Sequence, residues 1–423
     1  MKRFVINGPT KGVSGKINIS GAKNSCLPLM AASILFKKNI TLKNIPLVQD
    51  VFTMKKLLIS LGSNVTINEQ NKTMKIINSK KHKLKVPYNL VSTMRAGVLT
   101  MGPLIGRYQK EDIYVAKGGG CSLGIRDINY HLSGFETLKA YNSLSKGYVK
   151  ISTKNRGLLG SNYKFPKVTV TGSSNLIMAS VLAKGTQILK NISIEPEVID
   201  LITFLKNSGA NIKFLGKRTI RIIGVKEFTT GSHEIIGDRI EAFSYLCVAL
   251  ITKGEIEVKN INPQFLKTEL AILKKIGCKI KLSKDKIYLK SKKKQNPIKV
   301  KTGPYPNYAT DNMPMLLAVL SKVNGKSQIK ETIFSNRFMA SPELSRMGAK
   351  IKIKKNVAYI VGQKKLVGAD CISSDLRTTF AIILGALSAE GKSNILRIYH
   401  GLRGYSELEN KLKKIGVKVQ TKQ

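Results

Sequence analysis

One pattern occurs six times along the 423 residues, and it constrains the fold more than any other feature. Each copy has a polar start, an apolar stretch of helical length, a glycine and then a strand. The copies recur at intervals of 64–80 residues and open at Gly21, Ser92, Gly172, Asp238, Thr310 and Ser374. A repeat of this length is one supersecondary unit, which must stack on its neighbours to cover its apolar face.

A second element follows the first in every copy. In five copies it reads Leu-x-x-x-Gly and then alternates polar with apolar residues. These five segments begin at Leu58, Leu205, Leu273, Leu344 and Leu412, and the sixth, LKAYNSLSKGYVKI from Leu138, is looser. The glycine is predicted to end a helix in the left-handed conformation. The alternation after it predicts a strand with one buried face.

Helix and strand alternate within every copy, which predicts α/β layers with the helices inside or against sheets. Six such units exceed one hydrophobic core, so we expect three in each of two domains. Domain I is predicted to contain residues 1–21 and 237–423, and domain II to contain residues 22–236 with the loop around Cys121. The opening strand, residues 3–19, is then free to cross into the other lobe, and the polar stretch 229–237 marks the boundary.

The charge balance is extreme, with 72 Lys and Arg against 25 Asp and Glu and a net charge of +47. Such an excess attracts polyanions. Apart from Lys290–Lys294, however, the lysines are spread along predicted strands and helices as single residues, aromatic residues are 6%, and there is no Trp. We therefore expect anionic small substrates and consider a nucleic-acid partner unlikely.

Other features of the composition narrow the class of protein further. No apolar run approaches the ~18–20 residues of a membrane span, and the N-terminus lacks the apolar region of a secretory signal. Five cysteines without a CxxC pair, and four histidines without ligand spacing, argue against a disulfide scaffold and a zinc site. These features predict a protein of the cytoplasm, without membrane contact and without a bound metal.

Charged residues cluster at the polar starts of the repeats. The free N–H groups and the dipole of a helix N-terminus attract anions, whereas a cation there is unfavourable unless an anion joins it. Lys23 and Arg95 at equivalent starts therefore point to an anionic ligand. For Asp238, Arg239, Asp375 and Arg377 two interpretations stay open, namely ligand contact or salt bridges between domains.

The segment Lys117–Arg126, KGGGCSLGIR, is a second candidate site. Three glycines allow the backbone to approach a ligand closely. A thiol beside cations has a lowered pKa and can serve in acid–base or nucleophilic chemistry. Cys121 can thus be functional or an ordinary loop residue. Cys26, Cys247, Cys278 and Cys371 lie in apolar periodic contexts and are predicted to be core residues, and His131 is predicted to be structural.

Eleven short motifs occur in register along the whole chain. They are SGAKNSCLPLMAA (20–32), TMRAG (93–97), GGCSLGIR (119–126), EPEVID (195–200), DRIEA (238–242), TD (310–311), NRFM (336–339), PELSRMGA (342–349), SDLR (374–377), RIYH (397–400) and LRGY (402–405). Together they closely resemble the UDP-N-acetylglucosamine 1-carboxyvinyltransferase family. The fold that this resemblance implies is a two-lobed inside-out α/β barrel of six βαβαββ repeats, three per domain.

The resemblance implies an activity as well. Members of this family transfer the enolpyruvyl group of phosphoenolpyruvate to the 3′-hydroxyl of UDP-N-acetylglucosamine and release phosphate, the first committed step of peptidoglycan synthesis. No metal or other cofactor is needed. By the same resemblance Cys121 is the proton donor and the thiol alkylated by the epoxide fosfomycin, and Asp311 is the base.

The binding residues that the resemblance implies fall into two sets. Phosphoenolpyruvate would contact Lys23 and Asn24, with Arg126 and Arg403 on its phosphate, and Arg337 or Arg377 would join them on the tetrahedral adduct. The nucleotide sugar would contact Arg95, Arg126, Asp127, Ile128, Asn129, Tyr130, Lys167, Val168, Thr169, Val170, Asp311 and Ile333. The chain departs from the family pattern at Lys117, Gly118, Asn129, Thr171 and Gly237.

The sequence leaves two alternative functions open. A 5-enolpyruvylshikimate-3-phosphate synthase-like transferase would share the fold and donor but use another acceptor. A basic polyanion-binding protein on the same scaffold would explain the net charge and would be indifferent to Cys121.

Overall fold

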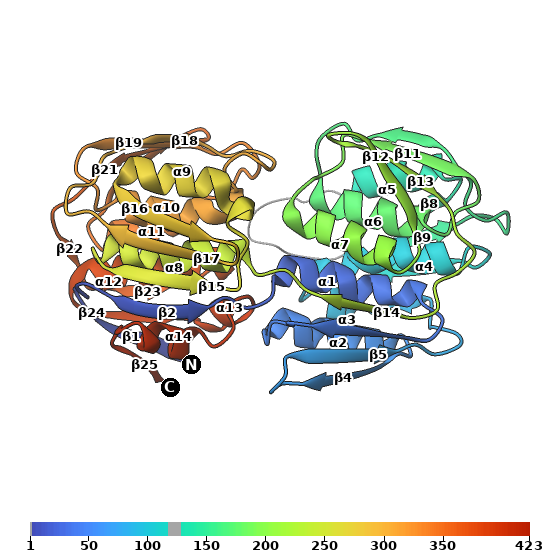
Figure 1. The fold of residues 1–423 in the computed structure, drawn as a ribbon, viewed down its shortest axis with the longest axis horizontal. Helices are drawn as coiled ribbons and strands as arrows, with labels where there is room; N and C mark the ends of the chain where they lie inside the picture. Colours follow the sequence, from blue (N-terminus) through green and yellow to red (C-terminus); the bar gives the residue numbers. More distant parts are fainter. Residues whose placement is uncertain (1, 117–127) are drawn as a thin grey trace. The chain divides into compact units, whose positions relative to one another are not determined.

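A computed structural model describes residues 2–116 and 128–423 (Figure 1). The chain forms two compact units, each with its own hydrophobic core. Unit 1 contains residues 2–20 and Gly237–Gln423, and unit 2 contains residues 21–116 and 128–236. The chain passes from unit 1 to unit 2 after Ser20 and returns after Ile236. Cys121, Arg126 and Asp127 lie outside the described residues.

Unit 2 has the following elements. Its helices are α1 (Lys23–Ala32), α2 (Gln49–Ser60), α3 (Tyr88–Val91), α4 (Met101–Arg107), α5 (Asn129–Thr137), α6 (Val170–Ser180) and α7 (Pro196–Asn207), with 3₁₀ turns η1 (Ser33–Leu35) and η2 (Arg95–Thr100). Its strands are β3 (Asn39–Lys43), β4 (Asn64–Asn68), β5 (Thr73–Ile77), β6 (Lys85–Val86), β7 (Ile113–Ala116), β8 (Tyr141–Ser145), β9 (Tyr148–Ser152), β10 (Asn162–Lys164), β11 (Thr186–Lys190), β12 (Asn211–Gly216), β13 (Thr219–Ile223) and β14 (Gly231–Glu234).

Unit 1 repeats the same order. Its helices are α8 (Arg239–Ile251), α9 (Lys267–Ile276), α10 (Met313–Leu320), α11 (Ala340–Arg346), α12 (Leu376–Ser388), α13 (Tyr399–Leu402) and α14 (Leu408–Lys414), with 3₁₀ turns η3 (Pro263–Leu266) and η4 (Thr310–Asn312). Its strands are β1 (Arg3–Gly8), β2 (Ser14–Asn18), β15 (Glu255–Lys259), β16 (Cys278–Ser283), β17 (Lys286–Ser291), β18 (Lys299–Lys301), β19 (Lys326–Lys330), β20 (Lys350–Lys354), β21 (Val357–Val361), β22 (Leu366–Val367), β23 (Asp370–Ile372), β24 (Ala389–Leu396) and β25 (Val419–Lys422).

The strands of the described residues form six sheets with one shared plan. A parallel pair is joined by a helix, and two antiparallel strands follow, as in β18-β19-β21-β20. The other sheets are β14-β3-β5-β4, β6-β7-β9-β8, β10-β11-β13-β12, β2-β15-β17-β16 and β22-β24-β1-β25, in which β23 also pairs with β24. This is the βαβαββ repeat, and the predicted inside-out α/β fold is confirmed.

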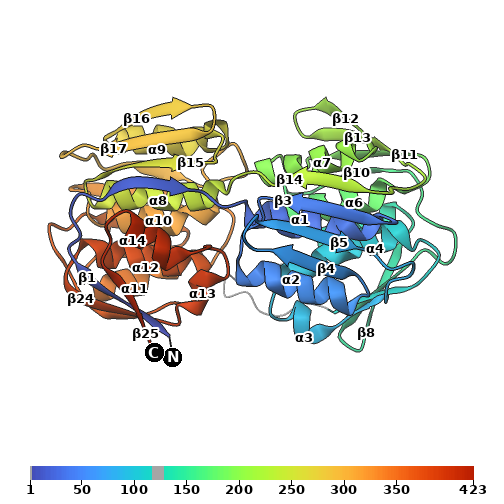
Figure 2. The ribbon, with the colours of Figure 1, turned by 60° about the horizontal axis from the view of Figure 1, so that its bottom comes forward.

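Three of these sheets contain strands distant in sequence. β1, near the N-terminus, pairs with β24 and β25, near the C-terminus. β2 lies before the first crossing and pairs in parallel with β15, which follows the return. β14 lies before the return and pairs in parallel with β3. Figure 2 shows β2 beside β15 and β14 beside β3. Each unit thereby supplies all the strands of its own three sheets.

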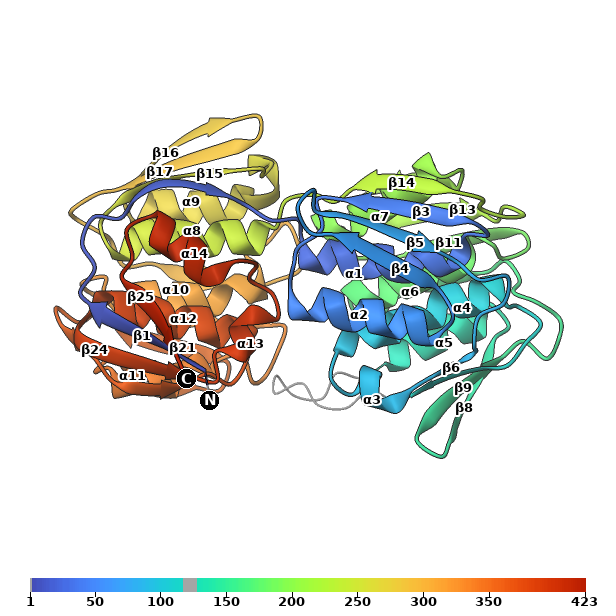
Figure 3. The same ribbon diagram turned by 90° about the horizontal axis from the view of Figure 1, so that it is seen from below.

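The inner helix of each repeat is enclosed by its unit. Every residue of α8 is buried, and α10 and α12 pack against it and against each other (Figure 3). Beyond their first turns these helices are mostly apolar, as expected for helices without a solvent face. The outer helices are amphipathic: α9 buries Glu269, Leu270, Leu273 and Ile276, which follow the spacing of one helical face.

The predicted helix ends are also observed. Gly62, Gly209, Gly277, Gly348 and Gly416 all have positive φ. In the looser sixth copy Lys139, with φ 63°, takes the place of the glycine. The backbone turn is therefore the same in all six copies, and Lys139 adopts a conformation that glycine takes without steric cost.

Candidate functional site

The polar starts of the repeats coincide with the first turns of the inner helices. In unit 2, Lys23 is the first residue of α1 and Arg95 is the first residue of η2. In unit 1, Asp311 lies in η4 directly before α10, and Arg377 lies in the first turn of α12. Candidate residues from separate repeats therefore occupy equivalent positions in each unit.

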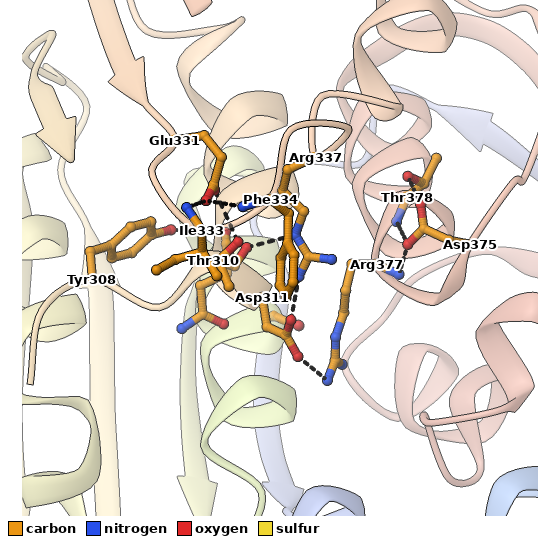
Figure 4. A network of polar contacts seen from close by, with 12 residues as sticks. Tyr308, Thr310, Asp311, Glu331, Ile333, Phe334, Arg337, Asp375, Arg377 and Thr378 are labelled. Carbon is orange, nitrogen blue, oxygen red and sulfur yellow. Dashed lines mark hydrogen bonds and ion pairs between the residues drawn. The ribbon is translucent and has the colours of Figure 1, made fainter. Parts of the chain in front are cut away.

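Asp311 is the centre of a charged cluster in unit 1 (Figure 4). Its Oδ1 accepts a hydrogen bond from Nη2 of Arg337, and its Oδ2 lies 3.2 Å from Nη2 of Arg377. Both arginines are buried, whereas the Asp311 side chain is 28% exposed. Two guanidinium groups thus orient one carboxylate that an external molecule can still reach.

Glu331 fixes the backbone around this cluster. Its Oε2 accepts from the Thr310 hydroxyl at 2.9 Å, and its Oε1 accepts from the backbone N–H groups of Ile333 and Phe334 at 2.6 and 3.2 Å. Arg337 is held in turn by its Nε, which donates to the Thr310 carbonyl at 2.9 Å. The chain around Ile333, which is exposed, is therefore tied to the turn that carries Asp311.

The two aspartates whose role was left open are helix caps. Asp238 accepts from the backbone N–H groups of Ile240 and Glu241 at the start of α8. Asp375 accepts from those of Arg377 and Thr378 at 2.8 and 3.1 Å. Side-chain oxygens at this position satisfy N–H groups that have no partner within the helix. The Arg377 guanidinium pairs with Asp311 instead.

Lys23 has an acidic partner that the sequence analysis did not identify. Its Nζ lies 3.0 Å from Oδ2 of Asp50, in the first turn of α2, and both side chains are buried. A cation at a helix start opposes the dipole, and Asp50 offsets that cost. An acidic residue in the first turn of a predicted helix was the only available signal for Asp50.

A second buried carboxylate holds the same turn of α1. Asp200 of α7 accepts hydrogen bonds from the Ser25 hydroxyl and, at 2.8 Å, from Nε2 of His233 on β14. Asp200 therefore joins three segments distant in sequence. None of its contacts follows from local pattern, and the sequence analysis missed it.

The remaining predicted residues lie at element ends. Asn24 is half-buried in α1, Ile128 precedes α5, and Asn129 and Tyr130 open it. Lys167 is exposed and Val168 half-buried. Thr169 caps α6 by accepting from the Gly172 N–H at 3.3 Å, Val170 begins the helix, and Arg403 is half-buried after α13.

The histidine and the four cysteines that the sequence analysis predicted to be structural lie in the protein interior. His131 is buried, with its ring nitrogens 3.2 Å from the Thr171 hydroxyl and 2.8 Å from the Asn175 amide. Cys26, Cys247, Cys278 and Cys371 are buried as predicted. Burial raises the pKa of the Cys278 and Cys371 thiols to about 12, so both stay protonated at neutral pH.

Comparison with known proteins identifies the family. Residues 8–412 match the family EPSP synthase (3-phosphoshikimate 1-carboxyvinyltransferase). The chain is 45% identical over 420 residues to a UDP-N-acetylglucosamine 1-carboxyvinyltransferase of Pelagibacter ubique, covering 99% of both chains. It is 41% identical over 424 residues to one of Campylobacter lari, again covering 99% of both.

The chain belongs to the UDP-N-acetylglucosamine 1-carboxyvinyltransferase family. It is a transferase with the fold of that family. Among solved structures, the enolpyruvyl transferase NikO from Streptomyces tendae superimposes with a TM-score of 0.89 at 19% identity, covering 99% of this chain and 98% of NikO. An EPSP synthase from Acinetobacter baumannii superimposes with a TM-score of 0.76 at 17% identity, covering 100% of both. These two likenesses support the fold.

No helix of the described residues is long and apolar enough to cross a membrane. No group of three or more His, Cys, Asp or Glu in residues 2–116 and 128–423 is arranged to hold a metal ion.

We predict that Asp200→Ala lowers the free energy of unfolding by about 1–3 kcal/mol, because Ser25 and His233 lose a buried acceptor. Urea denaturation measures this change. Asp112→Ala is the control, since Asp112 and Lys150 form an exposed pair at 2.7 Å, whose loss should cost less than about 1 kcal/mol. Equal losses in the two variants would contradict a special role for Asp200.

Proposed function

We propose that this chain transfers the enolpyruvyl group of phosphoenolpyruvate to the 3′-hydroxyl of UDP-N-acetylglucosamine and releases phosphate, the first committed step of peptidoglycan synthesis. The observation that carries the proposal is the 45% identity, over 99% of both chains, to a relative with this enzyme's name. The charged cluster around Asp311 supports it, because the reaction needs a carboxylate and preplaced cations. The substrates are small anionic molecules, so nucleic acid takes no part in the reaction.

The proposed chemistry is addition followed by elimination. Cys121 donates a proton to the methylene carbon of phosphoenolpyruvate, which builds positive charge at C2. The sugar hydroxyl attacks C2 while Asp311 accepts its proton. The adduct then loses phosphate from C2 and a proton from its methyl group, which restores the C=C bond of the enolpyruvyl group. General acid and base catalysis of this kind contributes about 10²–10⁴-fold in rate.

Cations stabilise the negative groups of the adduct. We assign Lys23, Asn24, Arg126 and Arg403 to phosphoenolpyruvate and its phosphate. Arg337 and Arg377 orient Asp311 and add positive charge beside it. Arg95, the segments 126–130 and 167–170, and Ile333 are assigned to the nucleotide sugar. Because both substrates are charged molecules that do not cross membranes unaided, we place the reaction in the cytoplasm.

Phosphate release from phosphoenolpyruvate tests the function directly. We expect release with UDP-N-acetylglucosamine and none with shikimate 3-phosphate or without acceptor. Release with shikimate 3-phosphate alone would keep the donor chemistry and overturn the acceptor. A folded protein inactive with both acceptors would overturn the proposal.

Substitution of Cys121 tests the acid. Cys121→Ala should reduce turnover at least about 10²-fold, since the proton donor is lost. Cys121→Asp should keep activity and resist alkylation by fosfomycin, because a carboxylic acid can donate the proton but has no thiol. Cys371→Ala is the control and should leave turnover and alkylation unchanged, because that thiol is buried. Normal turnover of Cys121→Ala would remove Cys121 from the reaction.

Substitution of Asp311 tests the base. Asp311→Ala should lower kcat by at least about 10²-fold, while calorimetry still detects UDP-N-acetylglucosamine binding. Asp370→Ala is the control, because the Asp370 carboxylate accepts a hydrogen bond from the Asn394 amide at 2.6 Å and has no part in the proposed reaction. A nearly normal kcat for Asp311→Ala would rule out the assignment.

A further inference from the structure

The sheet β18-β19-β21-β20 has an unusual solvent face. Its inner face packs on α10 and α11. Figure 1 shows β18 and β19 at the upper edge of unit 1. The outward residues of β18, β19 and β20 are seven exposed lysines and Gln328: Lys299, Lys301, Lys326, Lys330, Lys350, Lys352 and Lys354. We call these seven residues the lysine face.

The strand register sets the lysines in rows. Lys301 is directly opposite Lys330. Lys326 and Lys350 lie on either side of Val361, and Lys330 and Lys354 lie on either side of Val357. Strands are about 4.8 Å apart, and like charges directly opposite each other are destabilising. Lys301 and Lys330 therefore form an unfavourable pair, and the face as a whole gathers positive charge that an anion would neutralise.

No acidic side chain offsets this charge. The four strands contain neither Asp nor Glu. Within residues 2–116 and 128–423, none of the seven ammonium groups forms an ion pair. The sheet β2-β15-β17-β16 of the same unit is different: Lys290 lies 2.8 Å from Glu255, and Lys259 lies 3.6 Å from Glu257. A lysine-rich sheet of this protein can therefore have acidic partners, and the lysine face differs because its lysines have none among the described residues.

The inner strand β21 adds apolar and aromatic side chains to the same face. β21 presents Val357, Tyr359 and Val361 on the same side, and Tyr359 is 40% exposed. An apolar line with one aromatic ring thus runs between rows of cations on β19 and β20. Proteins that bind single-stranded nucleic acid combine a positively charged track for the backbone with aromatic rings on which bases stack.

We propose that the lysine face and Tyr359 bind single-stranded nucleic acid, with phosphates on the lysine rows and bases on the β21 line. The sequence argued against such a partner because the lysines are separated along the chain. The strand register brings them onto one surface. This surface contains none of the residues assigned to catalysis, so it is separate from the proposed reaction.

The test measures binding of a labelled 20-nucleotide single-stranded RNA between 50 and 300 mM salt. The test variant carries Lys301→Gln, Lys330→Gln and Lys354→Gln. The control carries Lys279→Gln, Lys281→Gln and Lys284→Gln, which remove the same charge from the other sheet. Loss of three phosphate contacts should reduce the slope of log affinity against log salt by about 2 in the test variant, with little change in the control.

A further variant and a second ligand test the apolar line. Tyr359→Ser should weaken RNA binding at least fivefold while leaving the salt slope unchanged, because stacking and not charge is lost. Duplex RNA of the same sequence should bind more weakly than the single strand. We expect phosphate release to be unchanged in all three variants, and this result would show that they are folded. Equal losses in the two triple variants, tighter duplex binding, or no binding by the wild-type chain would overturn the proposal.

Discussion

Three apolar helices in each unit must be hidden from water, and this requirement arranges everything else. Every residue of α8 is buried and its charged side chains are confined to the first turn, so sheets and other helices cover it on all sides. The βαβαββ repeat does this, since each inner helix is covered by one sheet, of four strands in five cases and five strands in the sixth. The sides of these helices are closed, so charged groups are placed at their ends. Lys23, Arg95, Asp311 and Arg377 lie at the starts of inner helices.

Much of this could be predicted from local pattern. The apolar stretch from Asp238 and the Leu-x-x-x-Gly segment from Leu273 specify an inner helix, an outer helix and a hairpin strand without distant information. The six copies then give the number of layers. Lys139 shows the limit of the pattern, because the backbone turn persists where the glycine does not.

The site was less predictable for a physical reason. Charges at helix starts could be recognised one at a time, but their partners depend on packing. Asp50 and Asp200 are ordinary acidic residues in their own helices, and only tertiary structure places them against Lys23 and Ser25. For the same reason the sequence left open whether Asp375 and Arg377 contact a ligand or form salt bridges between domains, whereas Asp375 caps the helix and Asp311 pairs with the Arg377 guanidinium.

These partners change the electrostatic argument for a ligand. Isolated cations at helix starts would require an external anion, yet Lys23 is already paired with a buried carboxylate, and removing either partner would leave a buried charge uncompensated. The cluster around Asp311 is different, because two guanidinium groups pair with one carboxylate that is still 28% exposed. A negative group that arrives there meets guanidinium groups already fixed in place. Such preorganised charge stabilises an anionic adduct without reorganisation at the moment of reaction. The described part of unit 1 thus offers electrostatic stabilisation at Asp311, whereas the Lys23 pair offers a positioned donor whose charge is already balanced.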